Sequence, residues 1–197
     1  MTCHLIIRVI AAIAVIIPAS LAFATQPEPM GDIDQSFLLK AVEGQHAEVA
    51  FGQSAIEKAS DDQVKQYGAR MIQDHEKASQ EGRQLAAKEG VRLPSQLSME
   101  HQQSQQKLSQ LSGKEFDKAY ISLMVQEHMK DLGDFQRGAQ TLNDPPARQW
   151  AQDTLPILMA HLESAKAIAA RIGAATSEID VPFGAFTDRR PESQLTK

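Results

Sequence analysis

Two copies of a histidine-centred heptapeptide are the chemically most informative feature of the sequence. MIQDHEK occupies residues 71–77 and MVQEHMK occupies residues 124–130, which places His75 and His128 in matching positions 53 residues apart. Imidazole nitrogens are common ligands of zinc, iron and copper. The repeat therefore allows two interpretations: two halves of one metal site, or one helix-packing pattern used twice.

Four polar residues interrupt apolar helical stripes, one in each of four long helical segments: Glu48, His75, His128 and His161. Counted from the turns near residues 60 and 143, the two members of each antiparallel pair differ in height by three residues. Three residues correspond to about 4.5 Å along a helix axis. We therefore expect one carboxylate and three imidazoles to converge at one level of the core as ligands of a zinc, iron or copper ion.

The neighbours of these histidines predict auxiliary roles. Asp74 and Glu127 directly precede His75 and His128 in the sequence and could orient the imidazoles as outer partners. Met71 and Met124 lie one helical turn earlier, and a thioether that reached the ion would favour copper.

A structural interpretation fits the same residues. Histidines on apolar stripes are often hydrogen-bonded core residues, Glu48 could accept hydrogen bonds from them, and methionine often fills core space. On this alternative the protein is a non-catalytic structural or interaction bundle that binds no metal.

Other motifs do not indicate an active site. Glu43 and His46 have the Glu-x-x-His spacing of di-iron bundles, but His46 lies about 200° around the helix from Glu48 and is expected to point outward. His101 lies in a polar connector and is expected to be solvated. None of the three candidate histidines has glutamate three positions before it, and we find no catalytic triad or phosphate loop. The sequence therefore favours a protein that is not an enzyme.

The elements that must position these residues are four amphipathic helices. Helical periodicity predicts them at residues 33–59, 61–89, 112–142 and 144–173, with a short polar helix in the connection 91–111. No stretch alternates as a strand would. The predicted fold is all-α, a four-helix bundle with a short extra helix between its second and third long helices.

Capping chemistry predicts where these helices begin and end. The signals are the capping boxes Ser60–Gln63 and Ser112–Glu115, the cap Asp144 before Pro145, and the terminating glycines Gly90 and Gly173. Pro156 lies inside the last helix and is expected to kink it.

The N-terminal residues 1–24 have the pattern of a cleaved secretory signal peptide. One arginine precedes an apolar run over residues 9–17, which is short for a membrane span of ~20 residues, and Ala22-Phe23-Ala24 fits a cleavage site. Cleavage would remove Cys3, which is the only cysteine.

The rest of the chain divides into three parts. Residues 25–32 are expected to be flexible, residues 33–173 to form the bundle, and residues 174–197 to form a disordered tail. Removal of Arg8 changes 20 basic and 25 acidic residues to 19 and 25, a net charge of −6. Mild acidity without a basic cluster argues against a nucleic-acid partner, so a metal ion is the one partner that the sequence suggests.

Five segments resemble an exported bacterial family with a ferritin-like bundle: AEVAFGQSA, VKQYGARMIQDHEK, GVRLP, FDKAYISLMVQEHMK and LPILMAHLESAKAI. Members are commonly labelled predicted outer-membrane proteins or domains of unknown function. The resemblance covers residues 36–172 and implies a family site at Glu48, Asp74-His75, His128 and His161. Because no segment has the alternation of a transmembrane strand, we expect the periplasm rather than the outer membrane as the location.

Overall fold

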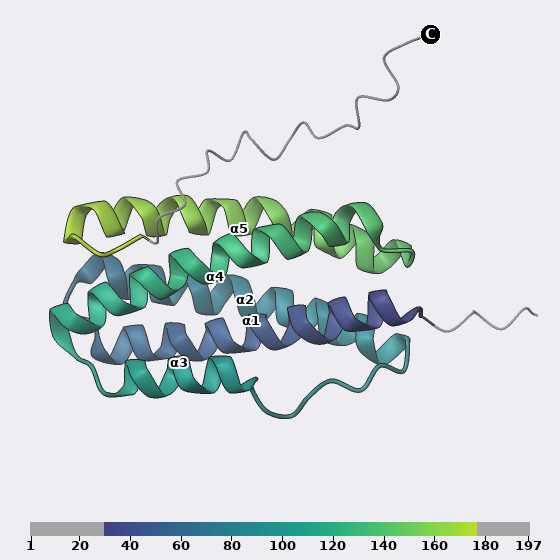
Figure 1. Ribbon diagram of the computed structural model, residues 1–197, viewed down its shortest axis with the longest axis horizontal. Coiled ribbons are helices and arrows are strands. Elements are labelled where there is room, and N and C mark those ends of the chain that lie inside the picture. The colour runs from purple at the N-terminus through teal and green to yellow at the C-terminus, as the bar shows by residue number, and fades with distance from the viewer. Residues whose placement is uncertain (1–29, 177–197) are drawn as a thin grey trace, which may run out of the picture.

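The computed structural model describes residues 30–176, and every secondary-structure element in this part of the chain is a helix. The helices are α1 (Asp32–Lys58), α2 (Asp62–Lys88), α3 (Met99–Ser109), α4 (Gly113–Thr141) and α5 (Pro145–Ile172). Four long helices run side by side and the short α3 lies outside them, next to α1 (Figure 1). The predicted all-α bundle with an extra helix in the second connection is confirmed.

The bundle consists of two antiparallel hairpins, α1–α2 and α4–α5. The first hairpin is especially close where Gly52 faces Gly68: a Cβ on Gly52 would lie 2.8 Å from the Gly68 carbonyl oxygen, and a Cβ on Gly68 would lie 2.7 Å from the Ala55 Cβ. Only residues without side chains allow the two backbones to approach so closely.

One buried aspartate from each hairpin forms hydrogen bonds to the turn of the other hairpin. Asp34, near the start of α1, accepts hydrogen bonds from the backbone N–H groups of Asn143 (3.0 Å) and Asp144 (2.6 Å) in the α4–α5 turn. Asp117, near the start of α4, accepts from the backbone N–H (2.9 Å) and the hydroxyl (2.5 Å) of Ser60 in the α1–α2 turn. Both carboxylates therefore satisfy backbone donors that the tight turns leave without partners.

This arrangement corrects the predicted capping box at Ser60. The N-cap of α2 is Asp61, whose Oδ1 accepts from the backbone N–H groups of Gln63 (2.9 Å) and Val64 (3.3 Å). The Ser60 hydroxyl donates to Asp117 instead, because a buried carboxylate from a distant helix is the stronger acceptor.

Other boundary predictions have mixed outcomes. Ser112 is the N-cap of α4 but its side chain makes no capping bond, because Gly113 at the first helical position has a φ of +61° rather than a helical value. Asp144 caps α5 as predicted, accepting from the backbone N–H of Ala147 (2.7 Å), and Gly173 ends that helix with a φ of +64°.

Aromatic clusters fill both ends of the bundle and leave the polar residues at mid-height. One cluster contains Phe37, Phe135 and Trp150, with ring centroids 5.2–5.9 Å apart. At the opposite end, Tyr120 stacks on Phe116 at 5.7 Å. The candidate site therefore lies between two layers of aromatic side chains.

The packed part of the bundle begins slightly before the first residue of α1. Met30 is buried, and its carbonyl accepts a hydrogen bond from Gln35 Nε2 (2.7 Å). The predicted signal peptide, residues 1–24, lies outside the described residues, as does the tail beyond residue 176. Within residues 30–176 no helix is both long and apolar enough to cross a membrane.

Candidate metal centre

The three candidate histidines meet in one buried cluster. His75 comes from α2, His128 from α4 and His161 from α5, and each residue is at most 1% exposed. The Nδ1 atom of His161 lies 3.2 Å from Nε2 of His75 and 3.3 Å from Nε2 of His128. One ring nitrogen from each residue thus points to a common position, and this grouping makes the cluster a candidate metal site.

Helical spacing explains why the repeated heptapeptide delivers both of its histidines to the interior. His128 follows buried Met124 by one turn and precedes buried Leu132 by one turn. His75 follows buried Met71 in the same way. Residues three or four apart share a helix face, so an inward methionine places the histidine inward too.

The outer nitrogen of each ring lies against a hydrogen-bond acceptor. His75 Nδ1 donates to Gln45 Oε1 (2.7 Å), His128 Nδ1 donates to the Met124 carbonyl (2.9 Å), and His161 Nε2 donates to Asp74 Oδ2 (2.8 Å). A carbonyl or carboxylate oxygen can only accept, so each ring carries its proton on the outer nitrogen. A neutral imidazole has one N–H, so a ring that is neutral and bonded in this way presents a lone pair at its converging nitrogen.

Glu48 lies on the outer side of two of these rings. Its Oε2 is 2.9 Å from Nδ1 of His75 and its Oε1 is 3.2 Å from Nδ1 of His128. The two N–H bonds point to Gln45 and Met124, so neither Glu48 oxygen receives an aligned hydrogen bond despite the short distances. The predicted ligand thus faces the outer nitrogens, where its charge favours a proton on each Nδ1.

The pKa values describe a carboxylate, Glu48, beside two imidazoles, His128 and His161, that resist protonation. Burial alone would raise the pKa of Glu48, but His75, His128 and His161 outweigh it and lower that pKa to about 2. Burial lowers the pKa of His128, and burial together with the neighbouring imidazoles lowers that of His161 to about 4. At neutral pH these two rings are therefore uncharged, with lone pairs available to a cation.

Among the predicted auxiliary residues, Asp74 contacts the cluster and Glu127 does not. The Asp74 carboxylate bonds His161 and also pairs with Arg70 Nε at 3.3 Å, at a partly exposed position. Met71 and Met124 are fully buried one turn from their histidines. Glu127 turns toward α3, where its Oε2 lies 3.6 Å from His101 Nε2, because α3 offers it a cationic partner.

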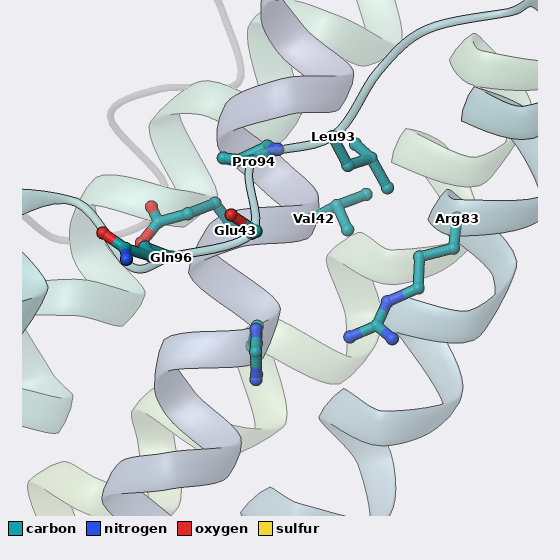
Figure 2. Close-up of a pocket in the computed structure, with 8 residues that line it drawn as sticks. Val42, Glu43, Arg83, Leu93, Pro94 and Gln96 are labelled. Carbon is teal, nitrogen blue, oxygen red and sulfur yellow. The ribbon is translucent and has the colours of Figure 1, made fainter.

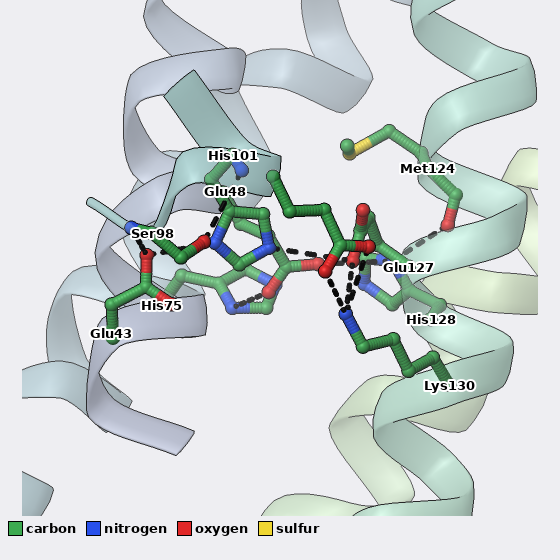
Figure 3. A network of polar contacts seen from close by, with 10 residues as sticks. Glu43, Glu48, His75, Ser98, His101, Met124, Glu127, His128 and Lys130 are labelled. Atoms are coloured by element: carbon green, nitrogen blue, oxygen red, sulfur yellow. Dashed lines mark hydrogen bonds and ion pairs between the residues drawn. The ribbon is translucent and has the colours of Figure 1, made fainter. Parts of the chain in front are cut away.

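His101 itself corrects the expectation of a solvated connector residue. It is 6% exposed, packs edge-on against Phe51, and places Nδ1 2.8 Å from Glu43 Oε1. Burial lowers its pKa, but the hydrogen bonds and charges of Glu127 and Glu43 raise it overall to about 9. Figure 3 shows this imidazolium network beside Glu48 and His128. His46, by contrast, is exposed as predicted.

Gln45 is the contact that sequence reasoning missed. It is 1% exposed and lies three residues before Glu48, on the same inward face of α1. That spacing is the signal that could have identified it.

Comparison with solved structures shows the same helical fold in two proteins. A DUF305 fragment from Deinococcus radiodurans superposes with a TM-score of 0.66 at 11% identity, covering 73% of this chain and 99% of that one. A DUF305 protein from Streptomyces coelicolor, described as secreted, gives a TM-score of 0.65 at 13% identity, covering 75% of this chain and 97% of that one.

Comparison with curated proteins finds no match. A family model does match residues 19–168, a span that contains all four helices of the two hairpins up to Ile168 of α5. The chain therefore belongs to the family described as Domain of unknown function (DUF4142).

Proposed function

We propose that the protein is an exported bundle that binds one transition-metal ion between His75, His128 and His161. The observation that carries this proposal is the convergence of one ring nitrogen from each of three histidines in a fully buried position. Three lone pairs at such distances repel one another unless a cation lies between them. A metal ion with imidazole ligands is the cation that such a site is suited to hold.

The spacing of the nitrogens supports this proposal. Ligand distances of 2.0–2.1 Å and tetrahedral angles place imidazole nitrogens about 3.3–3.4 Å apart. The two measured separations, 3.2 and 3.3 Å, are close to that value. The rings would need little movement to coordinate an ion.

The outer partners also suit a metal site. Histidine ligands commonly donate their second N–H to a carboxylate or a backbone carbonyl, which fixes the ring and strengthens its basicity. Asp74 performs this role for His161, the Met124 carbonyl for His128 and Gln45 for His75. In this proposal Glu48 supplies compensating negative charge from the outer side, rather than a direct bond as the sequence suggested.

The inner ligand set favours zinc or copper over iron. All three inner donors are imidazole nitrogens, whereas non-haem iron commonly takes two histidines and a carboxylate. The fully buried Met71 and Met124 lie one turn away and would add a soft donor for copper if either sulfur reached the ion.

The location proposed for this activity is the periplasm. The N-terminal sequence has the pattern of a cleaved signal, and a protein with the same fold is described as secreted. A metal-binding bundle in that compartment would serve metal handling or the response to envelope stress.

A structural bundle without metal is the second candidate, and the same distances favour it. Separations of 3.2 and 3.3 Å are also within hydrogen-bonding range, so one added proton on His75 or His128 could bridge to His161. The lowered pKa values of His128 and His161 oppose protonation of those two rings at neutral pH.

Elemental analysis of the purified mature protein tests the proposal. After exposure to zinc or copper and removal of loosely bound ions, we expect about one equivalent of metal per chain. His128→Ala should abolish retention, whereas His46→Ala, which removes an exposed histidine of the same bundle, should not change it. Equal retention by both variants, or none by the parent protein, would favour the structural bundle.

A further inference from the structure

The buried position of the three histidines raises the question of how an ion could reach them. These residues are 0–1% exposed, and aromatic layers close both ends of the bundle. An ion must therefore enter from the side, between two helices. Of the two seams that join the hairpins, the one between α1 and α4 is covered by α3, which contacts both helices.

The attachment of α3 is mainly polar. Among its residues only His101 and Leu108 are buried. Gln105 Nε2 donates to Ser54 Oγ of α1 (2.9 Å), and Lys58 Nζ of α1 donates to the Ser109 carbonyl (2.9 Å). A helix with so little apolar burial can separate from the bundle at far lower cost than any of the four long helices.

The centre of this attachment is a latch, which consists of His101 held between Glu43 of α1 and Glu127 of α4. Glu43 Oε1 also accepts from the Ser98 backbone N–H at 2.8 Å, so it holds the first turn of α3 as well as the ring. Glu127 directly precedes the candidate ligand His128, and Glu43 lies five residues before Glu48. The latch therefore closes the seam beside His75 and His128 of the cluster (Figure 3).

The segments that connect α3 to the bundle are suited to move. Gly90 and Gly113 flank it with φ values of +68° and +61°, and neither has a neighbouring atom within 4 Å of where a Cβ would lie. The connector before α3 lies over a cavity of about 290 Å³ whose wall includes Leu93, Pro94 and Val42 (Figure 2). The connector can thus shift without displacing the packed core.

We propose that α3 is a hinged cover over the α1–α4 seam, latched by His101 between Glu43 and Glu127, and that its opening admits and releases the metal ion. This inference rests on the metal-binding function proposed above. In the closed state the latch slows exchange of the ion with solvent. Because opening precedes both entry and exit, weakening the latch accelerates both rates without changing the affinity.

Cobalt(II) ions added to metal-free mature protein provide the test, since tetrahedral cobalt absorbs visible light. Stopped-flow measurement gives the uptake rate, and extraction by a chelator gives the release rate. We expect His101→Gln to raise both rates by a similar factor, at least about five-fold, as for loss of one hydrogen bond to a charged group. The dissociation constant should stay within about two-fold of the parent value.

Glu57→Gln is the matched control, because it replaces an exposed glutamate of α1 that is outside both the latch and the connector cavity. Glu43→Gln is a second latch variant, made in case His101→Gln does not fold. Amide hydrogen exchange on metal-free protein gives an independent readout. We expect faster exchange in residues 102–108 of α3 than in mid-α1, and a further increase in the latch variants only.

The outcomes separate the two proposals. Binding of one cobalt equivalent with unchanged rates in both latch variants would overturn the cover and leave the metal function intact. Failure of the parent protein to bind cobalt would overturn both. Faster exchange of cobalt and of the α3 amides in the latch variants, with parent values for Glu57→Gln, is the result that supports the cover.

Discussion

Metal binding at the three-histidine cluster should raise the thermal stability of the protein by a calculable amount. Because His75, His128 and His161 come from both hairpins, unfolding would have to release the ion. An ion that binds only the folded state at a free concentration 100 times its dissociation constant adds ~2.7 kcal/mol to the free energy of unfolding. The structure describes 147 residues, from 30 to 176. For a domain of that size the gain corresponds to a rise in Tm of about 5–11 °C.

The assay is thermal unfolding of the mature protein followed by circular dichroism, in the presence of a chelator and then with excess zinc. His128→Ala should start from a lower Tm, because it empties a buried position, and should show no rise with zinc. His46→Ala should show the full rise. A rise below about 1 °C for the parent protein at saturating zinc, or an equal rise in His128→Ala, would refute the reasoning.

Three further predictions concern the fold. Asp117→Ala leaves the turn N–H groups of Ser60 and Asp61 without their acceptor and should cost about 2–4 kcal/mol in urea unfolding; a cost below 1 kcal/mol would show that water replaces the carboxylate. Gly82→Ala places a Cβ 2.5 Å from Val42 Cγ2 and 2.9 Å from the Trp150 ring, so overpacking should cost about 1–3 kcal/mol by the same assay; Gly44→Ala, where nothing lies within 4 Å, is its control. The raised pKa of His101, about 9 against 6.5, gives stability that is fully present below pH 6.5 and is lost as the pH rises through 9. The loss should be at most about 3 kcal/mol, and it should disappear in His101→Gln; an unchanged pH profile in that variant would contradict the assignment.

Local chemistry explains which features could be predicted from the sequence. The four long helices follow from apolar periodicity, which depends only on neighbours along the chain. The cap at Asp144 was predictable because its acceptor and its donor lie three residues apart. Ser60 looked equally suitable, but its hydroxyl bonds Asp117, which lies 57 residues away. No local pattern could reveal that competitor.

In the candidate site, too, some features could be predicted from the sequence and others could not. Helical phase brings His75, His128 and His161 together, and the sequence predicted that convergence. The position of Glu48 at the outer nitrogens depends on side-chain rotamers, which periodicity does not determine. His101 was expected to be solvated because α3 is polar, yet two glutamates from other helices supply the charge that allows its burial.

The energetics of the core bear on whether the cluster is structural or functional. Within the described residues, the amide nitrogen of Gln45 is buried without a hydrogen-bond partner, and the buried Glu48 oxygens have only the poorly aligned contacts with His75 (2.9 Å) and His128 (3.2 Å). Each such group costs roughly 1–3 kcal/mol relative to a satisfied one, and a buried charge costs more. A bundle selected only for stability would do better with apolar side chains of similar volume at these positions. A cation among the three histidines would change this balance, because it would attract the Glu48 carboxylate and neutralise the repulsion of the lone pairs. The unsatisfied groups are therefore easier to explain in a protein that binds an ion than in one that uses the cluster to fix helix register.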